Sequence, residues 1–187
     1  MQFKTVTEYS NELHQLLVSV SKHLYFGSDG YARYQYKPMD VNIRNCHKSN
    51  KEHLVYYIIR DHFSGTFTFR IASTKRSIPL ADFLYYAWSE DAGEEKYIYG
   101  MPDSIFIPQM ISTEELFFGL SSLGINPLNP PSGFASGIRV IRDIEDNLCF
   151  NMGRTADHSL EGMNKLRAKV YNYLINSSYR NNYFNKW

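Results

Sequence analysis

Few residues in this sequence combine the type and the spacing that chemistry requires. The six histidines form no pair at helical spacing, and Cys46 and Cys149 belong to no Cys-x-x-Cys or His/Cys cluster, so no zinc site is expected. Ser64 and Ser132 stand beside glycines but lack the flanking pattern of a nucleophile elbow or a triad.

Composition limits the classes of protein that this chain can belong to. The 187 residues are 43% hydrophobic and 21% charged, which is typical of one folded domain and excludes disordered, collagenous and coiled-coil chains. The start lacks the apolar segment of a signal peptide, and no stretch approaches the ~18 apolar residues that span a bilayer. Since two cysteines make no disulfide framework, we expect a cytoplasmic protein outside the membrane.

Charge is distributed unevenly along the chain. Residues 30–76 carry nine basic and three acidic side chains, whereas residues 77–150 carry three basic and eleven acidic ones, and residues 151–187 are basic again. This pattern is compatible with one face that meets phosphates and another that meets protein. Clustered, solvated surface charges explain it equally well.

Hydrophobic periodicity predicts the elements that must position these groups. Leucines and a valine at three- and four-residue steps predict an amphipathic helix over residues 7–24. Extended patterns then predict an antiparallel meander, with strands at 31–43, 54–59 and 66–71. Further predicted elements are helices at 77–88, 112–123, 138–148 and 159–174, and strands at 104–107 and 125–128. Ser112 with Glu115 forms a capping box, and Ser159 caps the last helix.

The order of these elements and several short motifs resemble a known family. Asp61-His62-Phe63-Ser64 at the end of a strand, and Leu123-Gly124-Ile125 after a helix, are the most specific motifs. In this order they resemble the catalytic core of DDE-type integrases and transposases, a retroviral-integrase-like branch of the ribonuclease H-like superfamily. The resemblance implies an α/β fold with a mixed five-stranded sheet over residues 31–152. A helical extension at 1–30 and a C-terminal helix and tail at 153–187 would pack beside it.

The resemblance also implies where catalytic groups should lie. Members of the family hold two divalent cations, ~3.5–4 Å apart, between carboxylates from the first strand, the fourth strand and a late helix. Asp40 matches the first position, but Pro108 and Gln109 occupy the second and Val140 the third. We therefore expect a degenerate site that binds no metal, unless the helix alignment slips and brings Asp143 towards Asp40.

Other carboxylates near these positions have different expected roles. Glu145 and Asp146 could approach the site if the helix alignment slips. Asp61 is expected to support its hairpin, as the Asp of this turn does in the resembling family. Since its expected partners are absent, Asp40 itself is better explained as an exposed surface carboxylate than as a remaining metal ligand.

Three functions follow as hypotheses. The first is a catalytically inactive integrase-core-like protein of a mobile element or prophage, which binds DNA or serves as a scaffold or partner in DNA integration, with no cofactor. Its expected phosphate contacts are Arg139, Arg142, Lys165, Arg167 and Lys169. The second is an active nuclease or recombinase that uses Mg²⁺ or Mn²⁺ with displaced carboxylates. The third is a protein-interaction module, and the resemblance implies a homodimer.

Aromatic side chains make up 16% of the sequence. Many fall within predicted core elements, where burial accounts for them. The remainder lie nearer the two ends and indicate a binding surface: Tyr25, Tyr31, Tyr34, Tyr171, Tyr179, Tyr183 and Trp187.

Overall fold

The computed structural model describes residues 5–90, 98–131 and 137–184, with side chains as far as residue 177. Its strands are β1 (Leu13–Phe26), β2 (Ala32–Tyr34), β3 (Glu52–Asp61), β4 (Phe67–Ser73), β5 (Ser104–Phe106) and β6 (Asn126–Leu128). Its α-helices are α1 (Leu80–Trp88), α2 (Glu114–Ser122), α3 (Ile138–Met152) and α4 (Leu160–Phe184). Two short 3₁₀ helices, η1 (Cys46–Lys48) and η2 (Gln109–Ile111), lie in connections. In the parts of the chain that are described, no helix has the length and apolar character needed to cross a membrane.

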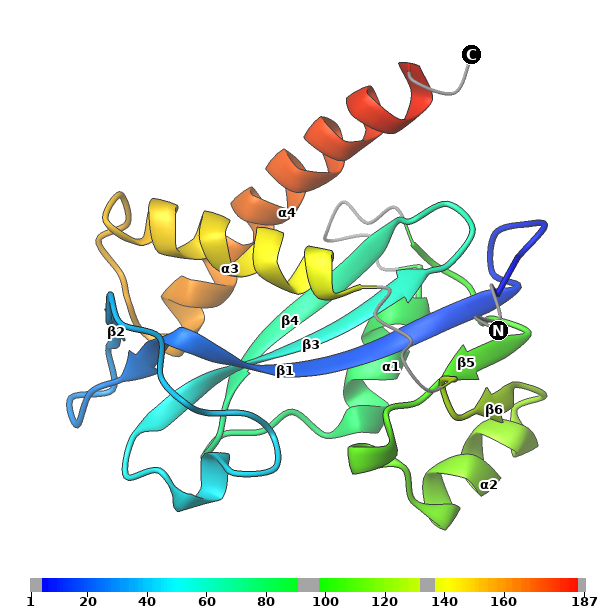
Figure 1. The fold of residues 1–187 in the computed structure, drawn as a ribbon, viewed down its shortest axis with the longest axis horizontal. Coiled ribbons are helices and arrows are strands. Elements are labelled where there is room, and N and C mark those ends of the chain that lie inside the picture. The colour runs from blue at the N-terminus through cyan, green and yellow to red at the C-terminus, as the bar shows by residue number, and fades with distance from the viewer. Residues whose placement is uncertain (1–4, 91–97, 132–136, 185–187) are drawn as a thin grey trace. The chain divides into compact units, whose positions relative to one another are not determined.

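The strands form one mixed sheet in the order β4-β3-β1-β5-β6, with β2 paired to β1 as a sixth strand (Figure 1). β1 pairs with β5 in parallel, so that His14 lies opposite Ile105, and β5 pairs in parallel with β6. β2 pairs with the end of β1 in antiparallel fashion. The five-strand path confirms the expected mixed α/β architecture, and β2 makes the sheet one strand larger than predicted.

Strand β1 is the main correction to the sequence analysis. The helix predicted over residues 7–24 is wrong, because Leu13–Phe26 is a strand of 14 residues at the centre of the sheet. The strand predicted over residues 31–43 is reduced to Ala32–Tyr34. A central strand covered on both faces shows near-continuous burial instead of alternation, which is why its leucines have helix-like spacing. The N-terminal segment is therefore part of the core sheet and not a helical extension.

The described residues divide into two compact units, each containing part of β1, β3 and β4. The first unit comprises Met1–Val18, Tyr57–Phe69 and Ile78–Gly137, and the second comprises Ser19–Tyr56, Arg70–Ser77 and Ile138–Trp187. Helices α1 and α2 belong to the first unit, and helices α3 and α4 belong to the second.

The first unit has a hydrophobic core between its strands and its helices. Leu16 of β1, Phe83 of α1 and Leu120 of α2 are all buried in this core. The rings of Tyr57 and Phe83 meet at 5.7 Å between centroids, which joins β3 to α1. Ile105 on β5 is also fully buried in the cluster.

In the second unit, α3 packs against α4 (Figure 1). Met163, Val170 and Leu174 of α4 are buried, as the sequence predicts. Asn164 joins α4 to β4, because its Nδ2 donates to the Ile71 carbonyl at 2.9 Å and its Oδ1 accepts from the Ile71 amide at 3.2 Å. This side chain satisfies backbone groups that an edge strand would otherwise leave unpaired.

The helix ends follow the predicted chemistry with one shift. Thr113, not Ser112, caps α2, and its hydroxyl accepts from the Leu116 amide at 3.2 Å. Ser159 caps α4 as predicted, and accepts from the Gly162 amide at 3.1 Å. Gly124 closes α2 with a positive φ of 81°, which favours glycine.

The core of the first unit yields a stability prediction. Phe83→Ala removes a ring that is 1% exposed and should lower the free energy of unfolding by about 3–5 kcal/mol. Tyr85→Ala is the matched control on the same helix, because Tyr85 is 77% exposed and its loss should cost no more than about 0.5 kcal/mol. Urea denaturation measures both, and equal losses would contradict the assigned orientation of α1.

Candidate functional site

The centre of the sheet is where the family's first two carboxylates would be expected. β1 occupies the first position, yet none of its 14 residues is Asp or Glu. Side chains alternate along a strand, so Gln15 and Leu17 lie on the face opposite the core residue Leu16. Arg60 Nη1 donates to Gln15 Oε1 at 3.2 Å, and this face therefore presents an amide and an aliphatic side chain.

The chain packs closely against Leu17 where α3 is about to begin. Gly137 has a φ of 103°, and a Cβ added to it would lie only 2.5 Å from Leu17 Cδ1. Glycine is therefore required at this position both by backbone conformation and by space.

The second carboxylate of the resembling family would be expected just after the end of β5, at Pro108 and Gln109. The Ile107 amide donates to the Leu128 carbonyl at 2.9 Å, after which Pro108 precedes η2, and Gln109, the first residue of η2, is exposed. Proline has no ligand atom in its side chain, and glutamine offers only a neutral amide oxygen. The end of β5 thus presents no charged oxygen at this point.

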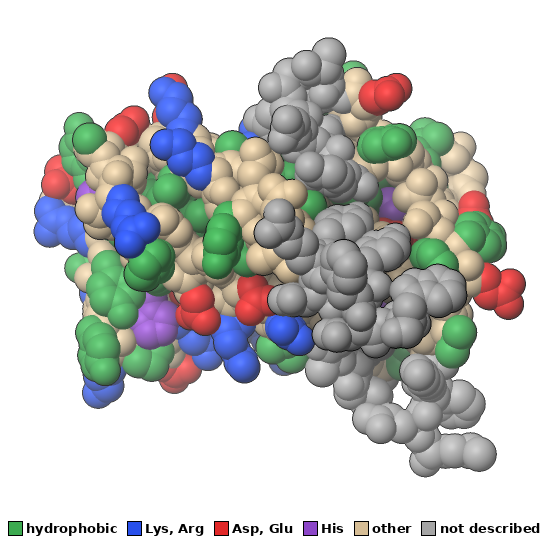
Figure 2. All heavy atoms as spheres, turned by 90° about the horizontal axis from the view of Figure 1, so that it is seen from above, with side chains coloured by type: hydrophobic (Ala, Val, Ile, Leu, Met, Phe, Trp, Pro, Cys, Tyr) green, Lys and Arg blue, Asp and Glu red, His purple; other side chains and the backbone are tan. Residues whose placement is uncertain are grey.

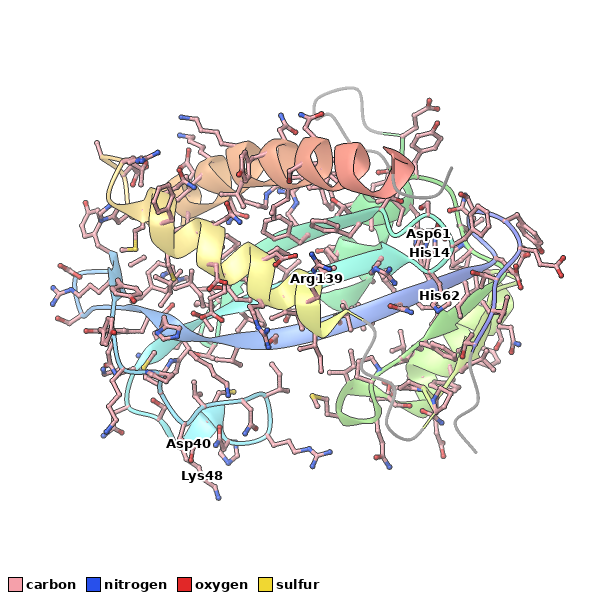
Figure 3. All side chains as sticks on the ribbon, turned by 45° about the horizontal axis from the view of Figure 1, so that its top comes forward. His14, Asp40, Lys48, Asp61, His62 and Arg139 are labelled. Atoms are coloured by element: carbon pink, nitrogen blue, oxygen red, sulfur yellow. The ribbon has the colours of Figure 1, made fainter. Side chains whose placement is uncertain are left out.

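Asp40 does not lie on a strand. It lies on the exposed loop between β2 and β3, near Lys48 and away from the start of α3, where Arg139 lies (Figure 3). Its carbonyl accepts from Asn45 Nδ2 at 3.3 Å. The match of Asp40 to the first carboxylate depended on a predicted strand that does not form, so this assignment is wrong and the surface interpretation stands.

On helix α3, which would carry the third carboxylate, two of the three acidic side chains have partners, and Asp146 is exposed. Val140 is partly buried, and Asp143 lies 3.7 Å from Arg139, an ion pair one turn apart. Glu145 Oε1 accepts three hydrogen bonds from β1: from Ser21 Oγ at 2.5 Å, from the Lys22 amide at 2.8 Å and from the His23 amide at 3.1 Å. Glu145 therefore stabilises the backbone of β1.

Cys149, on the same helix, is not a reactive thiol. Burial raises the pKa of Cys149 to about 12, and the nearby Glu145 and Asp146 carboxylates add to this effect. The thiol is consequently protonated at neutral pH and is neither a nucleophile nor a metal ligand there.

A buried polar network occupies one end of the first unit, where His14, Asp61 and His62 lie near one another (Figure 3). Trp88 Nε1 donates to His14 Nδ1 at 3.2 Å, so the proton of the neutral ring is on Nε2, which donates to Asn11 Oδ1 at 2.9 Å. Burial lowers the pKa of His14 to about 4, although Asp61 opposes the shift. His14 is therefore neutral and fixed in orientation.

Asp61 supports its turn, as the resemblance implies. Its carboxylate accepts from the Ser64 amide at 2.9 Å, from Ser64 Oγ at 2.5 Å and from the Asn11 amide at 3.2 Å. This residue is 1% exposed and holds the β3–β4 turn against the start of the chain. Within the described residues, no group of three or more His, Cys, Asp or Glu side chains could hold a metal ion.

Four of the five expected phosphate contacts are accessible. The Arg139 side chain is 92% exposed, Arg142 is exposed, and Lys165 is exposed but paired with Glu161 at 2.7 Å. Lys169 is also exposed. Arg167 is only 3% exposed, so its assignment as a phosphate contact is wrong.

Sequence reasoning missed a groove between α3 and α4. Its volume is about 370 Å³, and its lining residues are Asn147, Phe150, Asn151, Arg154, Thr155, Leu166, Lys169, Val170 and Tyr173. On each helix these residues follow a spacing of three and four, which is the signal that the sequence offered. Of the aromatic residues predicted for a binding surface, Tyr31 and Tyr34 are about half exposed, Tyr171 is buried, and Tyr179, Tyr183 and Trp187 lie outside the described side chains.

The sequence matches no protein-family model and no curated protein. The structure is similar to a chain of the simian T-cell lymphotropic virus intasome solved in complex with PP2A regulatory subunit B56 gamma, with a TM-score of 0.50 and 12% identity. That match covers 86% of this chain, which spans about half (48%) of the other. The HTLV-2 integrase catalytic core domain in complex with magnesium has a TM-score of 0.49 and 16% identity, covering 84% and 82% of the two chains. At 12% identity the first match shows a similarity of fold alone, between this chain and part of that intasome chain.

The buried histidine makes stability depend on pH. A base whose pKa is lowered to about 4 in the folded state, against 6.5 when unfolded, stabilises the fold fully above pH 6.5 and progressively less as pH falls towards 4. The difference between these two pKa values corresponds to a change of about 3 kcal/mol in the free energy of unfolding. His14→Gln, whose amide can accept from Trp88 and donate to Asn11, should remove this part of the pH dependence. Urea denaturation between about pH 4 and pH 7 measures it.

Burial also lowers the pKa values of His53 and His62. A weaker dependence of the free energy of unfolding on pH should therefore remain in the His14→Gln variant. An identical pH dependence in His14→Gln and the unsubstituted protein would show that His14 titrates normally.

Proposed function

We propose that this chain is a nucleic-acid-binding protein that uses an integrase-core fold without catalysing strand transfer. The observation that carries the proposal is the composition of the central strands. β1 contains no Asp or Glu, and β5 is followed by Pro108 and Gln109. As a protein of a mobile element or prophage, it would act beside an active partner in DNA integration.

The chemistry of the family explains why these substitutions matter. Two divalent cations about 4 Å apart repel one another and must be offset by anionic ligands. Leu17 and Pro108 offer no ligand atom, and the amides of Gln15 and Gln109 carry no charge. Since Glu145 is bonded to the backbone of β1, its carboxylate is also committed.

The proposed DNA-binding surface is the exposed side of α3 that carries Arg139 and Arg142. Residues three apart lie on neighbouring positions of a helix face, so these two guanidinium groups can reach adjacent phosphates. The Asp143 partner of Arg139 does not prevent this, because an exposed ion pair is worth only about 0–1 kcal/mol. Homodimerisation, which the resemblance implies, would double the surface.

Duplex binding tests the surface directly. Arg139→Glu combined with Arg142→Glu should lower affinity for a fluorescent DNA duplex and reduce the slope of log affinity against log salt by about 1.8, since each lost phosphate contact contributes about 0.9. Fluorescence anisotropy across a salt series measures both. Arg44→Glu combined with Lys75→Glu is the control, because it reverses the same number of exposed charges in the same unit.

Equal effects of the two double variants would show that DNA binding depends on net charge alone. This result would contradict a DNA-binding surface on α3. Absence of duplex binding at low salt would contradict DNA binding by this chain.

Metal dependence tests the catalytic part of the proposal. Titration calorimetry with millimolar Mn²⁺ should show no saturable binding, and supercoiled plasmid should remain intact with Mn²⁺ or Mg²⁺. Manganese-dependent cleavage that Asp143→Asn or Asp40→Asn abolishes would contradict the proposal and establish the displaced-carboxylate enzyme instead.

A further inference from the structure

The groove between α3 and α4 has a composition that neither the fold nor the proposed duplex surface requires. Both helices belong to the second unit, and Figure 3 shows them side by side. Phe150 on α3 and Tyr173 on α4 line the groove, and both are large rings left 65% and 63% exposed. Aromatic side chains exposed to this extent contribute little to the core of the chain and are available for contact with a partner.

Positive charge lies beside these rings. The Arg154 guanidinium carbon stands 4.4 Å from the centre of the Phe150 ring, and exposed Lys169 lines the opposite wall on α4. Among the side chains that the structure describes, none of those lining the groove is Asp or Glu. At the end of the molecule where the α3–α4 connection lies, Figure 2 shows Lys and Arg side chains interspersed with hydrophobic and acidic ones. The groove therefore favours an anionic partner with flat apolar surfaces.

Polar groups on α3 add directional contacts. Asn147 Nδ2 donates to the Asp143 carbonyl and Asn151 Nδ2 donates to the Asn147 carbonyl, both at 2.8 Å. These bonds fix the two amides against the helix, so that their Oδ1 atoms are held in set directions at the groove wall. Thr155 contributes a hydroxyl at the same wall.

We propose that this groove binds unpaired nucleotides of a single-stranded nucleic acid. Bases stack on the Phe150–Arg154 pair and on the Tyr173 ring, while Arg154 and Lys169 meet the adjacent phosphates. Aromatic rings and arginine planes are the usual stacking platforms for unpaired bases, and the volume of about 370 Å³ suits a small ligand group. A paired duplex does not present the faces of its bases, so the groove selects single strands. This inference extends the proposed nucleic-acid function to a second surface and a second form of the ligand.

The experiment uses the whole chain and a fluorescent oligothymidine of about twelve nucleotides, a length within the range that single-strand sites cover. Phe150→Ala and Tyr173→Ala should each weaken binding about tenfold, the loss expected for one base stack. Tyr173→Phe keeps the ring and should retain affinity. Arg154→Ala combined with Lys169→Ala should reduce the salt slope by about 1.4, because each phosphate on a single strand contributes about 0.7.

Matched controls lie outside the groove. Phe118→Ala removes a ring that is 77% exposed on α2. Lys75→Ala removes an exposed cation in the second unit, which also contains the groove. Both should bind oligothymidine as the unsubstituted protein does. Circular dichroism of each variant checks that it is folded, which is expected because Phe150 and Tyr173 are exposed.

The outcomes separate this inference from the duplex proposal. Oligothymidine binding that the groove variants weaken supports the groove even if duplex binding fails. Duplex binding without oligothymidine binding overturns the groove alone, as does oligothymidine binding that Phe150→Ala and Tyr173→Ala leave unchanged. An acidic peptide that binds through these residues while oligothymidine does not would also overturn it.

Discussion

Strand β1 is the element on which the rest of the structure depends. It lies between β3 and β5 in the sheet and also pairs with β2, so its backbone joins the antiparallel part of the sheet to the parallel part. Leu16 enters the core of the first unit, and Leu24 is fully buried in the second. A substitution that disrupts β1 is therefore expected to destabilise both units.

Polar side chains inside β1 impose a second constraint, because a buried polar group without a partner is costly. His14 is satisfied by Asn11 and Trp88, and Ser21 is satisfied by Glu145. Glu145 also accepts from two β1 amides. The acidic residue of α3 that reaches the strand is thus used to hold the backbone.

The sequence predicted most helices and the short parallel strands, because the helices have periodic apolar faces and recognisable caps, as with Ser159 at the start of α4. It failed at β1, where burial on both faces gives leucine spacing that resembles a helix. The error moved the first strand to residues 31–43 and selected Asp40. Arg167 was predictable: residues two apart on a helix point about 200° apart, so Arg167 cannot share a face with Lys165 and Lys169, and it is buried.

Helix α3 combines positions that are committed to packing with positions that face solvent. Ile144 and Leu148 are buried, and Glu145 bonds to β1. The exposed positions of α3 are Ile138, Arg139 and Arg142 near its start, Asp146 in its middle, and Phe150 near its end, beside α4. The proposed function uses the cations and the aromatic ring among these, because arginine and phenylalanine meet phosphates and bases well.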